Sequence, residues 1–345
     1  MNAAAAVKTQ VLLSARGLSK TFRAEDDLIA RIARRIGLAG PPSVVRALDD
    51  VDVTIHKGEV LGVVGESGCG KSTLGRTLAG LITPSSGEVL YQGRDIHGKG
   101  ADDKLRLKMQ MVFQNPHASL NARKRVGDII GEAVRAHRVV PPRDVDRHVS
   151  DIMDSSGLDP TWKSRFPHQF SGGQRQRINI ARALAVKPEL IICDEAVSAL
   201  DVSVQAQILN LFLELRRKFG LSYLFISHDL GVIRHVSDRI AVMYLGKVVE
   251  IGEAKDIFAR PAHPYTQALV KEIPSIKRDV DSFQPIKGEL PSPLSPPSGC
   301  HFHPRCEFTG PRCRSEVPRL TTLVNGHQAA CHLLTPGDVT KKEAA

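Results

Sequence analysis

The sequence lacks any apolar run that approaches the ~20 residues a helix needs to cross a bilayer. Its first residues, MNAAAAVKTQVLLSARG, also lack the basic start, the longer apolar stretch and the cleavage site of a secretory signal peptide. We therefore expect the chain to stay in the cytosol, where disulfide bonds are rare. No segment repeats itself, so we expect a single copy of the core fold.

The sequence also lacks an RNA-binding fingerprint and any stripe of alternating aromatic and basic residues. Its formal net charge of +10 would suit a nucleic acid or an anionic membrane surface. Because Lys and Arg are spread along the chain, we favour a solvated basic surface with sites for phosphate, and no nucleic-acid partner. The hydrophobic fraction of 42% and the charged fraction of 24% are typical of a soluble globular protein.

The pattern of apolar residues predicts an α/β fold in a chain of 345 residues, long enough for one large domain or two ordinary ones. Strands are expected at 11–22 and 44–56, and from 59 to about 252 short apolar strands alternate with helices. The later strands are expected in EVLGVVG, LKMQMVFQ, ELIICD, SYLFIS and RIAVMY, and the helices at 71–81, 172–186, 203–219 and 229–235.

Three segments depart from this alternation. Residues 24–43 form an insert whose Leu28, Ile29, Ile32 and Ile36 would share one helical face, which suits either lipid, a partner, or packing on the same domain. We favour packing on the same domain. Residues 120–170 read as a polar helical subdomain, and QPIKGELPSPLSPPSG reads as a proline-rich linker before a cysteine-containing tail.

The stretch GESGCGKST matches a phosphate-binding loop placed between an apolar strand and a helix. Its glycines let backbone N–H groups surround phosphates, Lys71 would reach the β- and γ-phosphates, and Ser72 would bind Mg²⁺. The predicted nucleotide-binding residues are Gly65, Glu66, Ser67, Gly68, Cys69, Gly70, Lys71, Ser72 and Thr73.

Two acids follow the apolar strand of ELIICDEA, at the edge of the sheet where ligands of open α/β folds gather. Asp194 would hold Mg²⁺, and Glu195 would polarise the attacking water. Together with the glycine loop, these acids predict a Mg²⁺-dependent nucleoside triphosphatase.

The stretch FSGGQRQR resembles the signature of the ATP-binding-cassette family, which lies between the two ATP motifs. Ser171, Gly172, Gly173 and Gln174 would form a second anion site at a helix N-terminus. The resemblance implies that the signature of one cassette covers the ATP held by another, so that two nucleotides lie between two cassettes.

The same resemblance assigns roles to three further residues. Gln114 in VFQNP would sense Mg²⁺ and the attacking water, Asp201 in SALD would lie in the loop that joins the two cassettes, and His228 in ISHD would contact the γ-phosphate. The sequence departs from the family at Ala196, where proline is usual and would fix the turn after the catalytic glutamate. Phe22 is the nearest candidate for the aromatic ring that stacks on adenine.

The stretches HPYTQAL and GELPSPLSPPSGC, with the cysteine tail, resemble the ATPase subunits of oligopeptide and dipeptide importers from about Val11 to Leu333. The resemblance implies an ABC-type nucleotide-binding domain, with a RecA-like core and antiparallel β and helical subdomains, followed by a small cysteine-containing C-terminal extension. The expected division is 11–260 for the cassette and 261–335 for the extension.

Four of the six cysteines lie in the tail, in the pattern C-x5-C-x6-C-x17-C, which leaves Zn²⁺ and [4Fe–4S] open as metals. In that tail a metal would supply a missing core. The family resemblance implies a [4Fe–4S] cluster on Cys300, Cys306, Cys313 and Cys331. Cys69 and Cys193 are not needed for such chemistry.

The resemblance implies an ATP-hydrolysing subunit on the cytoplasmic face of the bacterial inner membrane that drives uptake of di- and oligopeptides. It would work with two transmembrane permease subunits, a second, non-identical cassette subunit, and a peptide-binding protein outside the membrane. The alternatives are an importer ATPase for nickel or another small solute, a soluble cassette protein acting on nucleic acid or ribosomes, and an inactive regulatory subunit. The last is disfavoured by the presence of Lys71, Glu195 and His228.

Overall fold

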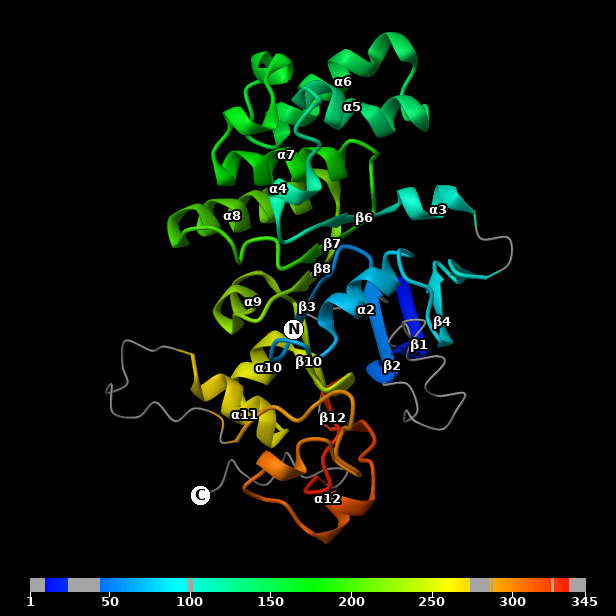
Figure 1. The fold of residues 1–345 in the computed structure, drawn as a ribbon, viewed down its shortest axis with the longest axis vertical. Coiled ribbons are helices and arrows are strands. Elements are labelled where there is room, and N and C mark those ends of the chain that lie inside the picture. The colour runs from blue at the N-terminus through cyan, green and yellow to red at the C-terminus, as the bar shows by residue number, and fades with distance from the viewer. Residues whose placement is uncertain are drawn as a thin grey trace, which may run out of the picture.

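A computed structural model describes two β-sheets with helices packed around them (Figure 1). The described residues are 10–23, 44–98, 102–273, 286, 288–323 and 326–334. The helix expected in the insert 24–43 therefore lies outside the described residues.

The smaller sheet is antiparallel throughout. Its strand order is β2-β1-β4-β5, with β1 at Val11–Arg23, β2 at Val44–His56, β4 at Ser86–Tyr91 and β5 at Arg94–Asp95. In β2 the buried side chains of Val51, Val53 and Ile55 alternate with more exposed ones, so one face of the sheet packs into the core. The strands predicted at 11–22 and 44–56 are confirmed, whereas β4 and β5 are not among the predicted strands.

The main sheet has the order β11-β12-β10-β9-β3-β8-β7-β6. Its parallel strands are β3 (Val60–Val64), β6 (Met109–Val112), β7 (Leu190–Asp194), β8 (Ser222–Ile226) and β9 (Arg239–Tyr244), and its antiparallel additions are β10 (Lys247–Glu253), β11 (Thr321–Thr322) and β12 (Gln328–Ala329). Every residue of β3, β7 and β8 is buried, which explains their near-continuous apolar sequences.

Helices cover both faces of the main sheet. Successive residues of β7 alternate between two cores, because Ile192 packs with α2 (Lys71–Leu78) and the smaller sheet, and Ile191 packs with the helices opposite. Those helices are α7 (Gly172–Leu184), α8 (Val202–Phe219) and α9 (Leu230–Val236). The helices α2 and α7 therefore lie on opposite faces of the sheet.

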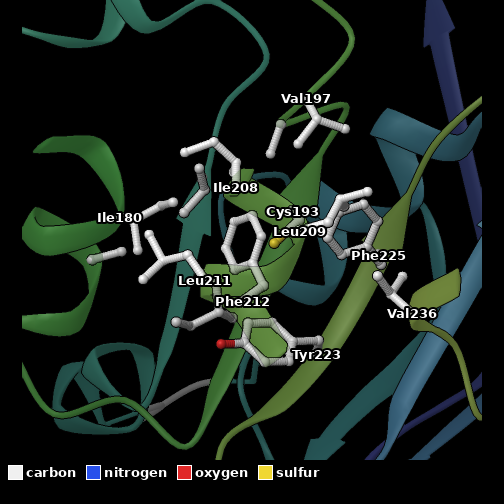
Figure 2. Close-up of a cluster of buried hydrophobic side chains, with 14 of the residues drawn as sticks. Ile180, Cys193, Val197, Ile208, Leu209, Leu211, Phe212, Tyr223, Phe225 and Val236 are labelled. Atoms are coloured by element: carbon white, nitrogen blue, oxygen red, sulfur yellow. The ribbon is translucent and has the colours of Figure 1, made fainter. Parts of the chain in front are cut away.

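Aromatic packing anchors α8 on the second face (Figure 2). Phe212 meets both Tyr223 and Phe225 of β8 edge to face, with ring centroids 5.6 Å apart in each pair. Such pairs add about 0.5–1.5 kcal/mol each beyond the burial of their area. The helix ends at Gly220, whose φ of 64° is a left-handed conformation that favours glycine.

The region 120–170 is mainly helical, as predicted. It contains α5 (Val126–Ala136) and α6 (Val145–Ser155), together with short 3₁₀ turns at Pro142–Asp144, Pro160–Ser164 and Pro167–Gln169. The preceding chain forms α3 (Asp103–Leu107) and α4 (Pro116–Ser119). The predicted helix at 71–81 ends earlier, at Leu78, because Gly80 adopts a left-handed φ of 74°.

The tail joins the main fold directly. After α10 (Ala254–Ala259) and α11 (Pro264–Lys271), the described tail contains a 3₁₀ turn at His303–Arg305 and α12 (Pro311–Ser315). Phe302 is buried in the same core as α8 and α9, and β12 pairs with β10 through Glu250–Ala329 and Ile251–Gln328. The tail thus gains a core from the cassette, and the expectation that it needs a metal for one is wrong.

A buried carboxylate connects β10 of the main sheet, the start of α11 and the tail. Glu250 of β10 is 0% exposed and accepts hydrogen bonds from the backbone N–H groups of Ala262 (2.7 Å) and His263 (2.8 Å). Its Oε1 also lies 2.7 Å from Nε2 of His327. Removing one partner of such a buried group would leave a polar atom unpaired, which typically costs about 1–3 kcal/mol.

His263 caps α11 from a fully enclosed position. Its Nδ1 accepts a hydrogen bond of 3.0 Å from the backbone N–H of Tyr265, so the ring acts as the N-cap. Burial lowers the pKa of His263 to about 4, while the charge of Glu250 acts in the opposite direction. The imidazole therefore stays neutral in the folded chain at neutral pH.

We predict that His263 makes the folded chain less stable in mild acid. In the unfolded chain this imidazole has a pKa of about 6.5 and binds a proton in mild acid, whereas in the folded chain it stays neutral. The free energy of unfolding therefore falls as the pH drops from about 6.5 towards 4. Between pH 7.5 and 5.5 this loss is about 1 kcal/mol.

The matched variant is His263→Asn, which keeps a capping side chain but cannot titrate. Free energies of unfolding of both chains at the two pH values, from denaturant titrations, give the difference. Every other titratable group is the same in both chains, so its contribution to the difference cancels. An equally steep decline in His263→Asn would contradict the prediction.

Candidate functional site

The loop 65–73 between β3 and α2 passes close to the backbone of two other strands. A Cβ on Gly70 would lie 2.2 Å from the carbonyl oxygen of Ala47 in β2, and one on Gly65 would lie 2.2 Å from that of Met243 in β9. Gly65, Gly68 and Gly70 have φ values of 154°, 78° and 105°. Glycine at 65 and 70 is therefore required by both conformation and space.

The loop ends at a helix start that fits an anion. The first hydrogen bond of α2 is donated by Leu74 to the carbonyl oxygen of Gly70 at 2.9 Å, so the N–H groups of Lys71, Ser72 and Thr73 precede the helical ladder. Gly70 has no side chain to cap them. Free N–H groups at the positive end of a helix are the arrangement that holds phosphate.

The buried ammonium group of Lys71 lies inside the curve of the loop. Its Nζ donates to the carbonyl oxygens of Gly65 (2.7 Å) and Glu66 (2.8 Å). The lysine is therefore anchored by the loop itself, with its charge at the place where the sequence predicts phosphates.

Ser72 and Asp194 form a pair of oxygen donors beside the loop. The Ser72 hydroxyl donates to Asp194 Oδ1 at 2.7 Å, and Asp194 is 4% exposed. Burial raises the pKa of the Asp194 carboxyl, while the Ser72 hydrogen bond and the charge of Arg76 act to lower it. A hydroxyl and a carboxylate oxygen are hard donors of the kind that Mg²⁺ takes, so this pair fits the predicted ion.

Three predicted residues meet at the ends of neighbouring strands. Glu195 follows β7, and its carboxylate accepts from Nε2 of Gln114 at 3.0 Å through Oε2, while Oε1 lies 3.4 Å from Nδ1 of His228. Glu195 itself has a φ of 50°, a left-handed conformation uncommon for this residue type and frequent at active sites.

Ser198 is a residue of this cluster to which the sequence patterns assign no role. Its hydroxyl accepts a hydrogen bond from Gln114 Nε2 at 3.3 Å and donates to the carbonyl oxygen of Glu195 at 2.9 Å. Its place in SALD, three residues after the glutamate, is the only sequence signal that pointed to it.

The turn after Glu195 is held without the usual proline. The carbonyl oxygen of Ala196 accepts a hydrogen bond of 2.7 Å from the fully buried Gln176 side chain of α7. This bond ties the turn to the helix that begins with the signature. It therefore restrains a turn that has alanine where the sequence resemblance leads us to expect proline.

The signature begins α7 with a reciprocal cap. Ser171 Oγ accepts from the N–H of Gln174 at 3.3 Å, and the Gln174 side chain accepts from the N–H of Ser171 at 3.0 Å. The glycines of the signature lie close to residues on either side of Asp201, since Gly172 faces Leu200 and Gly173 faces Val204 of α8.

The structure does not bring the signature to the phosphate loop of the same chain. The signature starts α7 on one face of the main sheet, and Lys71 starts α2 on the opposite face. Ser171, Gly172 and Asp201 are exposed, so this surface remains accessible to another molecule.

Phe22 lies near the end of β1 and is 40% exposed. The sheet register pairs it with Val45, two residues from Ala47, which packs against the phosphate loop. Lys20 Nζ lies 5.2 Å from the centre of its ring. The role of Phe22 as an adenine platform stays a prediction.

The tail cysteines lie in one region but form no metal site in the described structure. Among the described residues, no three His, Cys, Asp or Glu side chains are placed to hold a metal ion together. The prediction of a [4Fe–4S] cluster on Cys300, Cys306, Cys313 and Cys331 is therefore wrong for this arrangement. Burial raises the pKa of the Cys331 thiol to about 11 and also raises the pKa values of Cys300 and Cys306.

The family resemblance, and not the spacing, led to the wrong expectation, because the spacing alone left the metal open. Cys300 and Cys313 are joined through their backbones, with the N–H of Cys300 donating to the carbonyl oxygen of Cys313 at 2.8 Å. Cys300 and Cys306 pack against the main core.

The parallel sheet, the glycine loop and the Ser72–Asp194 pair define a phosphate-loop nucleoside triphosphatase. Comparison with known proteins narrows this class. Residues 48–198 match the family described as ABC transporter, and residues 249–313 match the family described as oligopeptide/dipeptide transporter, C-terminal region.

Relatives align over almost the whole chain. The oligopeptide transport ATP-binding protein AppF of Bacillus subtilis is 46% identical over 95% of this chain and 99% of its own length. The oligopeptide transport ATP-binding protein OppF of Salmonella typhimurium is 48% identical over 86% of this chain and 90% of its own length. The chain belongs to the ATP-binding-cassette ATPases, within the family of oligopeptide and dipeptide transport ATP-binding proteins.

Solved structures show the same fold. The cassette cbiO1 of Clostridium perfringens, part of an ABC transporter complex, superposes with a TM-score of 0.60 at 26% identity, over 73% of this chain and 92% of that one. A dimeric ATP-binding cassette bound to ADP and Pi superposes with a TM-score of 0.59 at 24% identity, over 70% of this chain and 99% of that one. The expected ABC-type nucleotide-binding fold is confirmed.

None of the helices in the described part of the chain has both the length and the apolar character of a membrane span.

We predict that Gly70→Ala destabilises the chain far more than Gly68→Ala. Both glycines have left-handed φ values, but only a Cβ at 70 meets a backbone oxygen, whereas a Cβ at 68 has no atom within 4 Å. The expected losses in free energy of unfolding are about 3 kcal/mol for Gly70→Ala and about 1 kcal/mol for Gly68→Ala.

Denaturant unfolding of the two variants beside the unmodified chain measures both losses. Equal losses would contradict the prediction, because they would mean that the loop moves away from Ala47 and that the contact with β2 does not restrict residue 70 to glycine.

Proposed function

We propose that this chain is the ATP-hydrolysing subunit of a bacterial importer of di- and oligopeptides. The observation that carries the proposal is the cluster of Gln114, His228 and Glu195 beside the Ser72–Asp194 pair, at the carboxyl edge of the main sheet. The peptide cargo is supported by the relatives, which are named as oligopeptide or dipeptide transport ATP-binding proteins and span nearly the whole chain. The same names favour peptides over nickel or another solute.

The loop would bind the triphosphate of ATP through its backbone N–H groups and Lys71, and Phe22 would stack on the adenine ring. Ser72 and Asp194, with Gln114, would hold Mg²⁺. When bound, this ion neutralises charge that develops on the phosphates. The remaining residues of the loop, Glu66, Ser67, Gly68, Cys69 and Thr73, would shape the site around the nucleotide.

Glu195 would accept a proton from, and orient, the attacking water, while His228 would contact the γ-phosphate. The hydrogen bond from Gln114 and the nearby ring of His228 hold the carboxylate on two sides. Its side chain is mostly shielded from solvent, so its orientation is set before ATP arrives.

A second cassette would complete each ATP site. Ser171, Gly172, Gly173 and Gln174 stand on the face of the sheet opposite the phosphate loop, with Asp201 beside them, so they suit a nucleotide held by another chain. We infer that the partner cassette is similar but not identical to this chain.

The proposed division places the cassette at 11–260, with 24–43 as an insert and about 120–170 as a helical subdomain, and the C-terminal extension at 261–335. The chain would lie on the cytoplasmic face of the membrane, bound to two permease subunits. A peptide-binding protein outside the membrane would deliver the cargo. These partners are the ones implied by family membership.

The test of the catalytic assignment is Glu195→Gln. ATP hydrolysis by the assembled transporter is expected to fall by about 100-fold or more, because the base is lost, while ATP affinity stays within about twofold. The control is Glu88→Gln, which removes an exposed carboxylate of the smaller sheet that pairs with Arg16 at 3.6 Å. Undiminished turnover in Glu195→Gln would refute the assignment.

A further inference from the structure

The second residue of the phosphate loop, Glu66, is bonded to the C-terminal part of the chain. Nη1 of Arg305 lies 2.9 Å from each of the two carboxylate oxygens of Glu66. The Arg305 side chain is 6% exposed, so this ion pair is largely shielded from water. Shielded pairs of this kind interact more strongly than pairs on the surface.

The backbone of Glu66 makes further hydrogen bonds in different directions. Its N–H donates to the hydroxyl of Tyr265 in α11 at 2.9 Å, and its carbonyl oxygen accepts from Nζ of Lys71 at 2.8 Å. One loop residue therefore connects the C-terminal part of the chain to the lysine that is placed to reach the phosphates.

Arg305 and Tyr265 are themselves held in place by aromatic packing. The ring centroids of Tyr244, Tyr265 and Phe302 lie 4.8 to 5.4 Å apart, and all three rings are buried. The N–H of Arg305 donates to the carbonyl oxygen of Phe302 at 3.0 Å, which fixes the turn that carries the arginine. The two C-terminal residues that bond to Glu66 are thus held in fixed positions.

The negative charge of Glu66 opposes phosphate binding, and Arg305 neutralises it. A carboxylate within a loop that binds phosphates repels them, and this repulsion weakens binding unless a cation neutralises it. Arg305 is the cation that the structure places on both carboxylate oxygens. Tyr265 acts on the same residue by holding its backbone N–H.

We propose that Arg305 and Tyr265 are positioning residues that set the nucleotide affinity of the phosphate loop through Glu66. The tail that contains Arg305 therefore belongs functionally to the ATP site, although neither residue is placed to touch the nucleotide. This inference rests on the proposed role of the loop in binding ATP.

The test compares Arg305→Ala, Arg305→Lys and the double variant Glu66→Gln/Arg305→Ala. Binding of the non-hydrolysable analogue AMP-PNP with Mg²⁺ to the full chain is measured by titration calorimetry. Arg305→Ala is expected to weaken binding about tenfold, because the carboxylate is left uncompensated. Arg305→Lys keeps the cation, and the double variant removes the carboxylate, so both are expected within about threefold of the unmodified chain.

Three further variants separate positioning from general stability. Arg312→Ala breaks an exposed pair with Glu316 in the same tail, at 2.9 Å, and is expected to leave the affinity unchanged. Glu66→Gln alone removes the carboxylate but keeps the arginine, so a net positive charge remains beside the loop, and this variant is expected to bind at least as tightly as the unmodified chain. Tyr265→Phe keeps the buried ring and is expected to weaken binding about threefold.

Three results would overturn the inference: an Arg305→Ala affinity equal to that of Arg312→Ala, a double variant as weak as Arg305→Ala, or binding weakened by Glu66→Gln alone. The Glu66→Gln measurement decides the matter even if Arg305→Ala does not fold, because it leaves the arginine in place. If the unmodified chain failed to bind AMP-PNP, the proposed function would fall instead. Normal binding by that chain with no effect in any of the Arg305 variants would defeat only the positioning role.

Discussion

The close approach of the loop 65–73 to the backbones of β2 and β9 is the constraint on which the rest of the site depends. Because Gly70 leaves no room beyond the carbonyl oxygen of Ala47, the smaller sheet must sit against the start of α2. Because Gly65 is equally close to Met243, the main sheet fixes the other end of the loop. The two sheets therefore meet at the loop, and its backbone N–H groups are aimed by both.

The chemistry at the edge of the main sheet follows from parallel strands. Neighbouring parallel strands end at the same edge, so residues that are far apart in sequence arrive together there. Asp194 ends β7 and Glu195 follows it, His228 follows β8 and Gln114 follows β6, and these three strands are adjacent. Each side chain lies at or just after the end of a strand. The order of the strands in the sheet therefore brings the cluster around Glu195 together.

Much of this arrangement could be predicted from the sequence, because it depends on local signals. Apolar runs in the sequence indicate the strands β1, β2, β3, β7, β8 and β9, and the glycines within residues 65–70 indicate a loop. The pairing of β12 with β10 and the bonds of Arg305 and Gln176 could not be predicted, since they join distant segments with no local pattern. The cluster expected on the tail cysteines comes from the family resemblance, and no local pattern revealed that Phe302 and β12 already attach the tail to the cassette.

The pair between Glu66 and Arg305 spans 239 positions of the chain. A ribosome adds about 5–20 residues each second, so the arginine is made roughly ten seconds or more after the loop that needs it. During that interval the nascent cassette carries an uncompensated carboxylate in its phosphate loop. A product that stops short of residue 305 keeps that defect permanently, and completion of the polypeptide thus becomes a condition for a finished nucleotide site.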